Sequence, residues 1–198
     1  TSRLIGREPG LVLHGGGNTS VKTTLLDELG EPCRALCVKG SGWDLATIAP
    51  AGLPAVRLGP LRALRRLPAL DDAAMVNAAR IHLLDAAAPS PSVEVLLHAF
   101  LPHAFIDHSH ADAILALVDQ PDAAALAAEV FGGRLAVVPY VMPGFALARQ
   151  AAELYERAPE REGLLLLQHG LFTFGATARE SYERHVAAVS AAEAYIAA

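Results

Sequence analysis

The first third of the chain alternates short apolar runs with glycine and proline, a pattern typical of β-strands joined by turns. Residues 15–17 and 40–42 are rich in glycine and predict turns. The stretch 52–68 is rich in Pro, Gly and Arg and indicates a loop that contains one short strand. The strands predicted in this part of the chain are 11–13, 18–22, 35–39 and 55–58.

The rest of the chain is dominated by apolar residues at helical spacing, interrupted by short apolar runs that predict buried strands. Met75, Ala79 and Leu83 are spaced four apart and share one face of a helix that begins after residue 72. Ser90 and Pro91 are favourable as the N-cap and first residue of the next helix. The predicted helices are 73–87, 90–100, 111–118, 121–131, 145–157 and 177–198, with strands at 104–110, 135–138, 163–168 and 171–174.

Strands and helices mix without a strict strand–helix–strand repeat, and neighbouring strands such as the last two suit antiparallel pairing. We therefore expect an α/β fold with a central, mainly antiparallel sheet and helices packed on its faces. The 198 residues suit a single domain, residues 1–198, because domains usually contain roughly 50 to 250 residues. No internal repeat is visible.

Composition narrows the class of protein. Hydrophobic residues make up 53% of the chain and charged residues 19%, which excludes a disordered chain and favours burial of surface between subunits of a homo-oligomer. The net charge of -5 is mild, and the densest basic cluster, Arg62, Arg65 and Arg66, lies in a segment of a kind that is usually solvated. We therefore expect no nucleic acid partner.

No apolar run approaches the roughly 20 residues that cross a bilayer, so we expect no contact with a membrane. Cys33 and Cys37 are the only cysteines, which fits reduced thiols and a cytoplasmic location. The first residue is Thr1 rather than Met, and Leu4 and Ile5 already have the character of core residues. The natural polypeptide could therefore extend beyond this sequence.

Three histidines are candidates for a metal site. His108 and His110 are two apart on a predicted strand, which places both rings on one face about 7 Å apart. On spacing alone, two polar residues at the end of a strand are a commoner explanation than two metal ligands. His169 follows the apolar run 164–167 and precedes Gly170, so an ionisable ring lies where a core strand ends and needs a partner. Three imidazoles with one open position are typical of catalytic zinc.

Glu94 is the candidate acid or base. It lies in the first turn of a predicted helix, where the helix dipole alone also favours a carboxylate. A carboxylate near a metal can take a proton from a carbon whose negative charge the metal will accept. His98 shares the helix face of Glu94 and could pair with it. The remaining histidines, assigned to solvent or core, are His14, His82, His103 and His185.

The two glycine turns could gather backbone N–H groups round a phosphate, although a glycine turn is more often only a turn. Ser90 and Ser92 would add hydroxyls and the dipole of their helix to such a site. Lys22 and Lys39 are nearby cations, but a surface position is the default expectation for a lysine.

Six stretches, taken together and in this order, resemble the class II aldolase and adducin-head family over nearly the whole chain. They are GGGNTS at 15–20, KGSG at 39–42, PSVEVLLHA at 91–99, HSH at 108–110, VPY followed by Gly144, and LLQHG at 166–170. The longer forms GGGNTSVK and VKGSGWDL are similar to the aldolase domain of bifunctional rhamnulose-1-phosphate aldolase and alcohol dehydrogenase proteins, in which a dehydrogenase domain follows. The resemblance implies a three-layer fold with helices on both faces of the sheet.

The resemblance further implies a metal-dependent lyase that cleaves a ketose 1-phosphate, rhamnulose-like or fuculose-like, to dihydroxyacetone phosphate and an aldehyde. His108, His110 and His169 would hold zinc or another divalent ion. Glu94 would exchange a proton with the reacting carbon. The partners would be a sugar phosphate and further copies of the chain, in a tetramer with sites between subunits.

The position of the catalytic tyrosine and the phosphate-binding segment match the family pattern less well than the metal ligands do. Tyr140 falls where the fuculose-phosphate aldolases have a tyrosine donated by a neighbouring subunit, although a tyrosine after proline also suits simple packing. Val93 replaces the second of two serines found before the glutamate in that type. The residues implied to recognise phosphate are Asn18, Ser41, Gly42 and Ser92.

Other functions remain open on the sequence. An epimerase, a dehydratase or a decarboxylase starts from the same enediolate, and the implied side chains do not separate these reactions. Adducin heads keep the fold as a metal-free scaffold, against which the presence of all three histidines and Glu94 argues. A module that binds an anionic sugar beside a structural metal is a third hypothesis.

Overall fold

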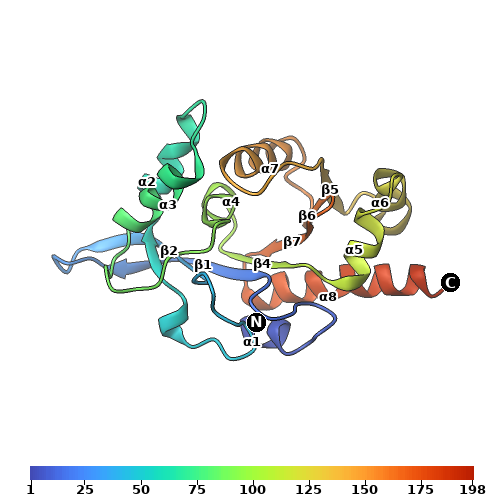
Figure 1. The fold of residues 1–198 in the computed structure, drawn as a ribbon, viewed down its shortest axis with the longest axis horizontal. Helices are drawn as coiled ribbons and strands as arrows, with labels where there is room; N and C mark the ends of the chain where they lie inside the picture. Colours follow the sequence, from blue (N-terminus) through green and yellow to red (C-terminus); the bar gives the residue numbers. More distant parts are fainter.

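The computed structural model describes all 198 residues, and its strands form one seven-stranded sheet in the order β3-β2-β1-β4-β7-β6-β5 (Figure 1). Every neighbouring pair is antiparallel except β5 and β6, which are parallel. The expectation of a mainly antiparallel sheet is therefore confirmed. None of the helices is both long and apolar enough to cross a membrane.

Strands and helices follow one another irregularly along the chain. The strands are β1 (Asn18–Leu26), β2 (Pro32–Val38), β3 (Ala55–Arg57), β4 (Phe105–Ser109), β5 (Leu135–Val138), β6 (Gly163–Leu166) and β7 (Gly170–Gly175). The helices are α1 (Ser2–Gly6), α2 (Leu58–Ala63), α3 (Asp72–Ile81), α4 (Val95–Phe100), α5 (Asp112–Val118), α6 (Ala123–Phe131), α7 (Phe145–Arg157) and α8 (Ala178–Ile196), with single 3-10 turns η1 (Pro50–Gly52) and η2 (Leu64–Arg66).

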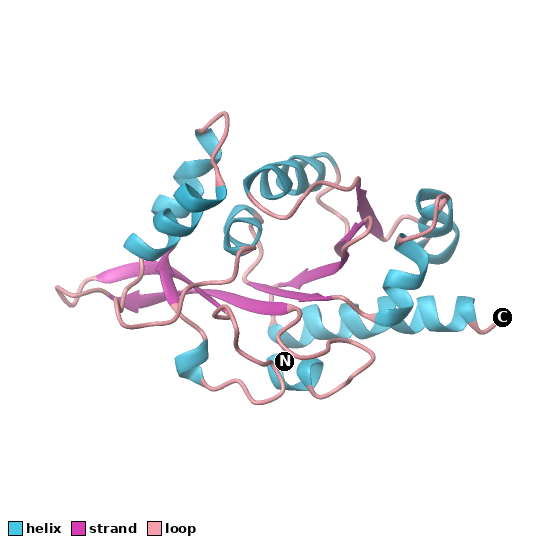
Figure 2. Ribbon diagram, viewed as in Figure 1, coloured by secondary structure: helices cyan, strands magenta, loops and turns pink.

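Helices cover both faces of the sheet, which confirms the three-layer α/β fold (Figure 2). On one face, α2, α3, α4 and α7 pack over strand residues such as Ile106 and Phe172. On the other face, α1, α5, α6 and α8 pack over strand residues such as Leu165 and Leu171. Successive residues of a strand point to opposite faces, so each buried strand contributes apolar side chains to both cores.

Four predicted elements differ from the structure. The helix predicted over 73–87 ends at Ile81, and Leu83 lies beyond it because this residue forms a bridge with Val56 of β3. Residues 11–13 form no strand and do not pair with the sheet, and Leu11 and Val12 are buried in the apolar core that also contains residues of α5 and α8. The stretch 52–68, expected as loop round one strand, also contains α2. The helix predicted from Ser90 begins at Val95 instead, because the segment before it is held extended by a bridge between Pro91 and Gly40.

The ends of three strands meet at one edge of the sheet. Asn18, the first residue of β1, pairs with His108 near the end of β4. His108 also pairs with Phe172, close to the start of β7. Because neighbouring antiparallel strands run in opposite directions, the start of β1 and β7 and the end of β4 lie together. At this place the ends of central strands come together, although Asn18 and His108 are about 90 residues apart in the sequence and His108 and Phe172 about 60.

Candidate functional site

His108 lies at the centre of this edge, fully buried on the face of the sheet covered by α4 and α7. Its ring stacks on Phe172 with centroids 3.9 Å apart. Nδ1 of His108 lies 3.0 Å from the carbonyl oxygen of Leu171, and since a carbonyl only accepts, Nδ1 carries the proton. Nε2 therefore offers a lone pair to the site, which is the state that binds a metal.

Burial lowers the pKa of His108 well below its usual value, although Glu94 opposes this effect. Burial also lowers the pKa of His110, which is partly exposed. Both rings are therefore neutral at physiological pH, as ligation of a metal requires.

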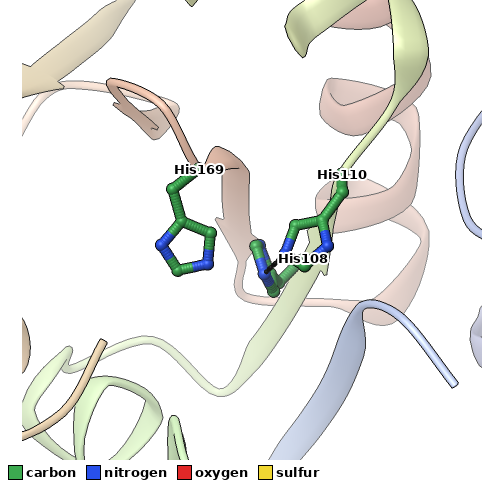
Figure 3. Close-up of side chains that lie close together, drawn as sticks. All are labelled: His108, His110 and His169. Atoms are coloured by element: carbon green, nitrogen blue, oxygen red, sulfur yellow. Dashed lines mark hydrogen bonds between the residues drawn. The ribbon is translucent and has the colours of Figure 1, made fainter. Parts of the chain in front are cut away.

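Figure 3 shows the three rings of His108, His110 and His169 converging, two from the end of β4 and one from the turn between β6 and β7. One ring nitrogen from each lies within 4.8 Å of the others. A zinc ion makes bonds of about 2.0–2.1 Å to imidazole nitrogen, so small side-chain adjustments bring all three within reach of one ion. Nδ1 of His169 is buried without a hydrogen-bond partner. The donor set fits a divalent metal.

Glu94 completes this cluster from the N-cap position of α4, with its side chain 8% exposed. Its Oε2 lies 3.3 Å from Nε2 of His108, and its Oε1 lies 3.1 Å from Nε2 of His169. Burial favours a higher pKa for Glu94, whereas the hydrogen bond donated by the Asn18 amide lowers the pKa. The Asn18 amide thus stabilises the ionised form of Glu94 beside the three rings.

Asn18 and Ser92 surround the carboxylate of Glu94. Nδ2 of Asn18 donates to Oε2 of Glu94 at 2.6 Å and to Oγ of Ser92 at 3.1 Å. Both hydrogens of the Asn18 amide are thus already used within the protein. Asn18 was expected from the family resemblance to hold phosphate, whereas its side chain here holds Glu94.

A hollow of about 200 Å³ opens beside these residues. Its wall is almost entirely polar backbone and short side chains. It is lined by Gly15, Gly16, Gly17, Asn18, Lys39, Ser41, Gly42, Ser92, Val93, Glu94 and His110. The wall thus includes both glycine turns and the segment before α4. The turn at 40–42 is joined to that segment by two hydrogen bonds, from Ser92 N to Lys39 O at 2.9 Å and from Ser41 N to Ser90 O at 2.8 Å.

Lys39, the lysine in this wall, is buried, whereas a surface position was the default expectation. Lys39 is 4% exposed, and its Nζ donates to the carbonyl oxygen of Gly15 at 2.6 Å, which ties one glycine turn to the other. Burial lowers the pKa of Lys39, while Asp44 and Glu94 act in the opposite direction. Lys22 is also buried, and its Nζ donates to the carbonyl oxygen of His103 instead of reaching the hollow.

The structure thus brings together most of the residues singled out in the sequence: the three histidines, Glu94, and the four expected to recognise phosphate. Tyr140 stands apart. It is 49% exposed, lies outside the wall of the hollow, and its hydroxyl contacts Sδ of Met142 at 3.8 Å. His98 does not pair with Glu94 directly, because its Nε2 bonds Oδ1 of Asn18.

Residues 1–196 match the model of the family described as the class II aldolase and adducin N-terminal domain. YuxG of Bacillus subtilis (strain 168), named an uncharacterized oxidoreductase, is 38% identical over 195 residues. The match takes in 98% of this chain but only 28% of YuxG. This chain therefore spans little more than a quarter of that relative, and most of the protein named an oxidoreductase lies outside the match.

Solved structures of class II aldolases are also similar to this chain. The N-terminal class II aldolase domain of a conserved protein from Thermoplasma acidophilum has a TM-score of 0.93 and 44% identity, covering 98% of this chain and 90% of that one. A sugar-phosphate aldolase from Thermotoga maritima has a TM-score of 0.71 at 18% identity, covering 98% and 93%. The l-fuculose-1-phosphate aldolase from Thermus thermophilus has a TM-score of 0.61 at 19% identity, covering 98% and 90%. The last two bear on the fold alone.

Proposed function

This chain belongs to the class II aldolase and adducin family, and from this premise we propose that it is a metal-dependent lyase for a ketose 1-phosphate. The products would be dihydroxyacetone phosphate and an aldehyde. The observation that carries the proposal is the buried carboxyl group of Glu94, which lies within 3.3 Å of both His108 and His169 at the end of a polar hollow.

Three imidazoles suit zinc, and His108, His110 and His169 would hold it. When bound, zinc supplies Lewis-acid stabilisation of negative charge that develops on substrate oxygen. Oxygen ligands would be expected for magnesium or calcium, and the all-nitrogen donor set therefore favours zinc over those ions.

Glu94 would carry the proton of the reacting carbon. In the condensation direction, its carboxylate takes the proton from the carbon next to the carbonyl, which leaves an electron pair for the new carbon–carbon bond. In the cleavage direction, that bond breaks, its electron pair stays on the carbon next to the carbonyl, and Glu94, once protonated from solvent, gives its proton to this carbon and releases dihydroxyacetone phosphate.

The phosphate of the substrate would lie against the glycine-rich wall of the hollow. Ser41, Gly42 and Ser92 line it, and their backbone N–H and hydroxyl groups are suited to an anion. Lys39 is the only amine in that wall and would add charge complementarity. Asn18 would contribute indirectly, by holding Glu94 and Ser92 through its amide.

Tyr140 cannot complete the site of its own chain from the position it occupies, so we propose that it acts on the aldehyde side of a neighbouring copy. During cleavage its phenol oxygen would accept the proton of the substrate hydroxyl while the phenol proton passes to solvent, and during condensation the phenol would donate a proton to the aldehyde oxygen. The exposed apolar side chains of Val93 and Met142 fit burial against another copy, since they are 53% and 70% exposed in the single chain. A tetramer with sites between subunits, working on a sugar phosphate in the cytoplasm, is the assembly we propose.

Replacement of Glu94 by glutamine tests the proposal. Glu94→Gln keeps the shape but cannot exchange a proton, so release of dihydroxyacetone phosphate from ketose 1-phosphates should fall by at least about 100-fold. Metal content should stay at the level of the unchanged protein. Glu31→Gln, which alters an exposed residue next to the β1–β2 turn, is the matched control and should keep full activity.

Full lyase activity in Glu94→Gln with metal bound would contradict the assignment. The same assay separates the related reactions. Consumption of a sugar phosphate without dihydroxyacetone phosphate would identify an epimerase, a dehydratase or a decarboxylase, and binding without turnover would identify a sugar-binding module.

A further inference from the structure

A row of buried polar side chains runs along β1 beneath α4. Asn18 and Ser20 point to the same face of the strand, two residues apart, and are 4% and 7% exposed. His98 of α4 lies over them with no exposed surface, its ring edge-on to Phe172 with centroids 5.6 Å apart. Both ring nitrogens of a fully buried histidine need hydrogen-bond partners, and the polar residues of β1 supply them to His98.

The hydrogen bonds of this row form one continuous chain that ends on Glu94. Oγ of Ser20 lies 2.7 Å from Nδ1 of His98. Nε2 of His98 in turn bonds Oδ1 of Asn18. Nδ2 of Asn18 donates to Oε2 of Glu94 at 2.6 Å. Four side chains from two elements, which are about 80 residues apart in sequence, are thus connected without a gap.

The direction of every bond in the chain follows from its end. The carboxylate of Glu94 only accepts, so the atom of Asn18 that faces it must be the amide nitrogen. Oδ1 of Asn18 then faces His98 and must accept, which makes Nε2 of His98 a donor. Nδ1 of a neutral His98 is left as the acceptor, and the hydroxyl of Ser20 donates to it.

His98 has no other protonation state that fits its surroundings. Burial lowers the pKa of His98 to about 3, although Glu94 opposes this effect. The ring is therefore neutral at any pH at which the protein would work, and it carries one proton, on Nε2. Asn18 fixes that tautomer, because its Oδ1 can only accept, and the hydroxyl of Ser20 donates to the other ring nitrogen.

Because of this chain of hydrogen bonds, the two carboxylate oxygens of Glu94 have different surroundings. Oε2 is held by Asn18, whereas Oε1 is buried and accepts no hydrogen bond from the protein. Oε1 lies beside His169, at 3.1 Å from Nε2. The oxygen without a donor is the one that is free to exchange a proton with a substrate.

We propose that Ser20 and His98 are positioning residues that act through Asn18 to hold Oε2 of Glu94 and leave Oε1 as the proton-transferring atom. This inference rests on the proposed lyase function. Neither residue touches the hollow, so neither would contact substrate. Their effect is on the rotamer and basicity of Glu94, as with the partners that orient ligands at metal centres.

Three variants test the proposal by their effect on the turnover number. His98→Leu removes the donor to Asn18 and should lower kcat for release of dihydroxyacetone phosphate by about 10–100-fold, with KM and metal content within about twofold of the unchanged protein. His98→Gln keeps an amide N–H close to the position of Nε2 and should restore most of kcat. Ser20→Ala leaves Nδ1 of His98 without its donor at a minimal loss of volume and should lower kcat in the same direction as His98→Leu, by a smaller factor.

His185→Leu is the matched control. His185 is equally buried and also bonds two hydroxyls, Oγ of Ser109 at 2.6 Å and Oγ1 of Thr173 at 2.9 Å, but on the far face of the sheet. Loss of this histidine should cost stability without changing kcat per folded, metal-loaded chain. An equal kcat in His98→Leu, or equal losses in His98→Leu and His98→Gln, would overturn the proposal.

A measurement without substrate separates this inference from the lyase itself. In ¹⁵N-labelled protein, the imidazole signals of His98 should report the Nε2-protonated tautomer at every pH between about 5 and 9. Ser20→Ala should keep the Nε2-protonated tautomer, because Oδ1 of Asn18 still accepts, and should shift the Nδ1 signal to that of a nitrogen without a hydrogen-bond donor. A Nδ1-protonated or charged ring in the unchanged protein would overturn the inference even if the lyase is confirmed, and the expected tautomer would support the hydrogen-bond chain even if the substrate is a different one.

Discussion

The turn that carries His169 depends on two unusual backbone conformations. Gln168 adopts a left-handed conformation with a φ of 56°, and Gly170 has a φ of 148°. A side chain at residue 170 would place its Cβ 2.4 Å from the carbonyl oxygen of Ser109 and 3.1 Å from Cδ2 of His110. His169 therefore reaches the other two histidines only because the next residue has no side chain.

Gly170→Ala should both destabilise the protein and disturb the metal site. Strain at the positive φ and the clash with β4 together should lower the free energy of unfolding by on the order of 3 kcal/mol, and the altered turn should weaken metal binding. Urea unfolding and metal titration measure the two effects. Gly59→Ala is the control, since a Cβ there meets nothing within 4 Å and alanine favours the helix α2. A Gly170→Ala protein as stable as Gly59→Ala would contradict this account of the turn.

The chemical type of each site residue could be predicted from the sequence, whereas its burial and its contacts could not always be predicted. The sequence alone reveals the candidate metal ligands His108, His110 and His169 and the acidic Glu94. Imidazole and carboxylate side chains can bind a metal or transfer a proton, and each residue lies in a short motif of neighbouring residues. The burial of Lys39 depends on a carbonyl 24 residues earlier, which local sequence cannot show. Likewise, the spacing of Glu94 and His98 suggested a direct pair, because it could not show that Asn18 lies between them.

Secondary-structure elements were predicted best where burial is continuous. Strand β5 has the bounds 135–138 expected from its apolar run, and β4, β6, β7 and the long helix α8 lie within a few residues of the predictions. These elements are defined by apolar side chains that must be buried whatever surrounds them. The sheet order that joins them was not predictable from the chain, because strand pairing is decided by contacts between distant segments.

The start of α4 shows why a good local signal can fail. Ser90 and Pro91 are favourable at the start of a helix, yet Ser90 accepts from Ser41 N and Pro91 bridges to Gly40. Tertiary hydrogen bonds therefore keep the segment extended, and the helix starts five residues later. The consequence is functional, since this extended segment brings Ser92 and Glu94 up to the turn at residues 40–42.

The stability of the whole molecule should depend on pH through its buried histidines. Burial lowers the pKa of His98 and His185 from 6.5 to about 3 in the folded protein. Below pH 6.5 the unfolded chain binds protons at these residues and the folded chain does not. The free energy of unfolding should therefore fall as the pH falls from about 6.5 toward 3, by up to about 1.4 kcal/mol per pH unit for each histidine.

One carboxyl group acts in the opposite sense. Burial raises the pKa of Asp107 to about 6, so the folded protein binds a proton there between about pH 4 and 6 while the unfolded chain does not, which offsets one histidine. The net expectation is a lower free energy of unfolding at pH 5 than at pH 7, measured by urea unfolding. His185→Leu should show a weaker pH dependence than the unchanged protein, and an identical dependence would argue against a buried, neutral His185.

At the scale of the molecule, the site is a meeting of three strand ends that lie far apart in the sequence. Periodicity predicted most of the strands, but only the family resemblance placed Asn18, Glu94 and the histidines in one site, because no local pattern encodes the pairing of β1 with β4 and of β4 with β7. The single-domain expectation for residues 1–198 stays a prediction, as does the role of Tyr140 in a neighbouring copy.

The most direct test of the account is the metal content of protein purified without chelator and without added metal. Elemental analysis should find about one divalent ion, zinc by preference, per chain, and little or none in His110→Ala or His169→Ala. His82→Ala, which removes a histidine whose side chain makes no contact with the site, should keep the metal. A metal content near zero in the unchanged protein that added zinc does not restore would contradict the account and favour a metal-free scaffold.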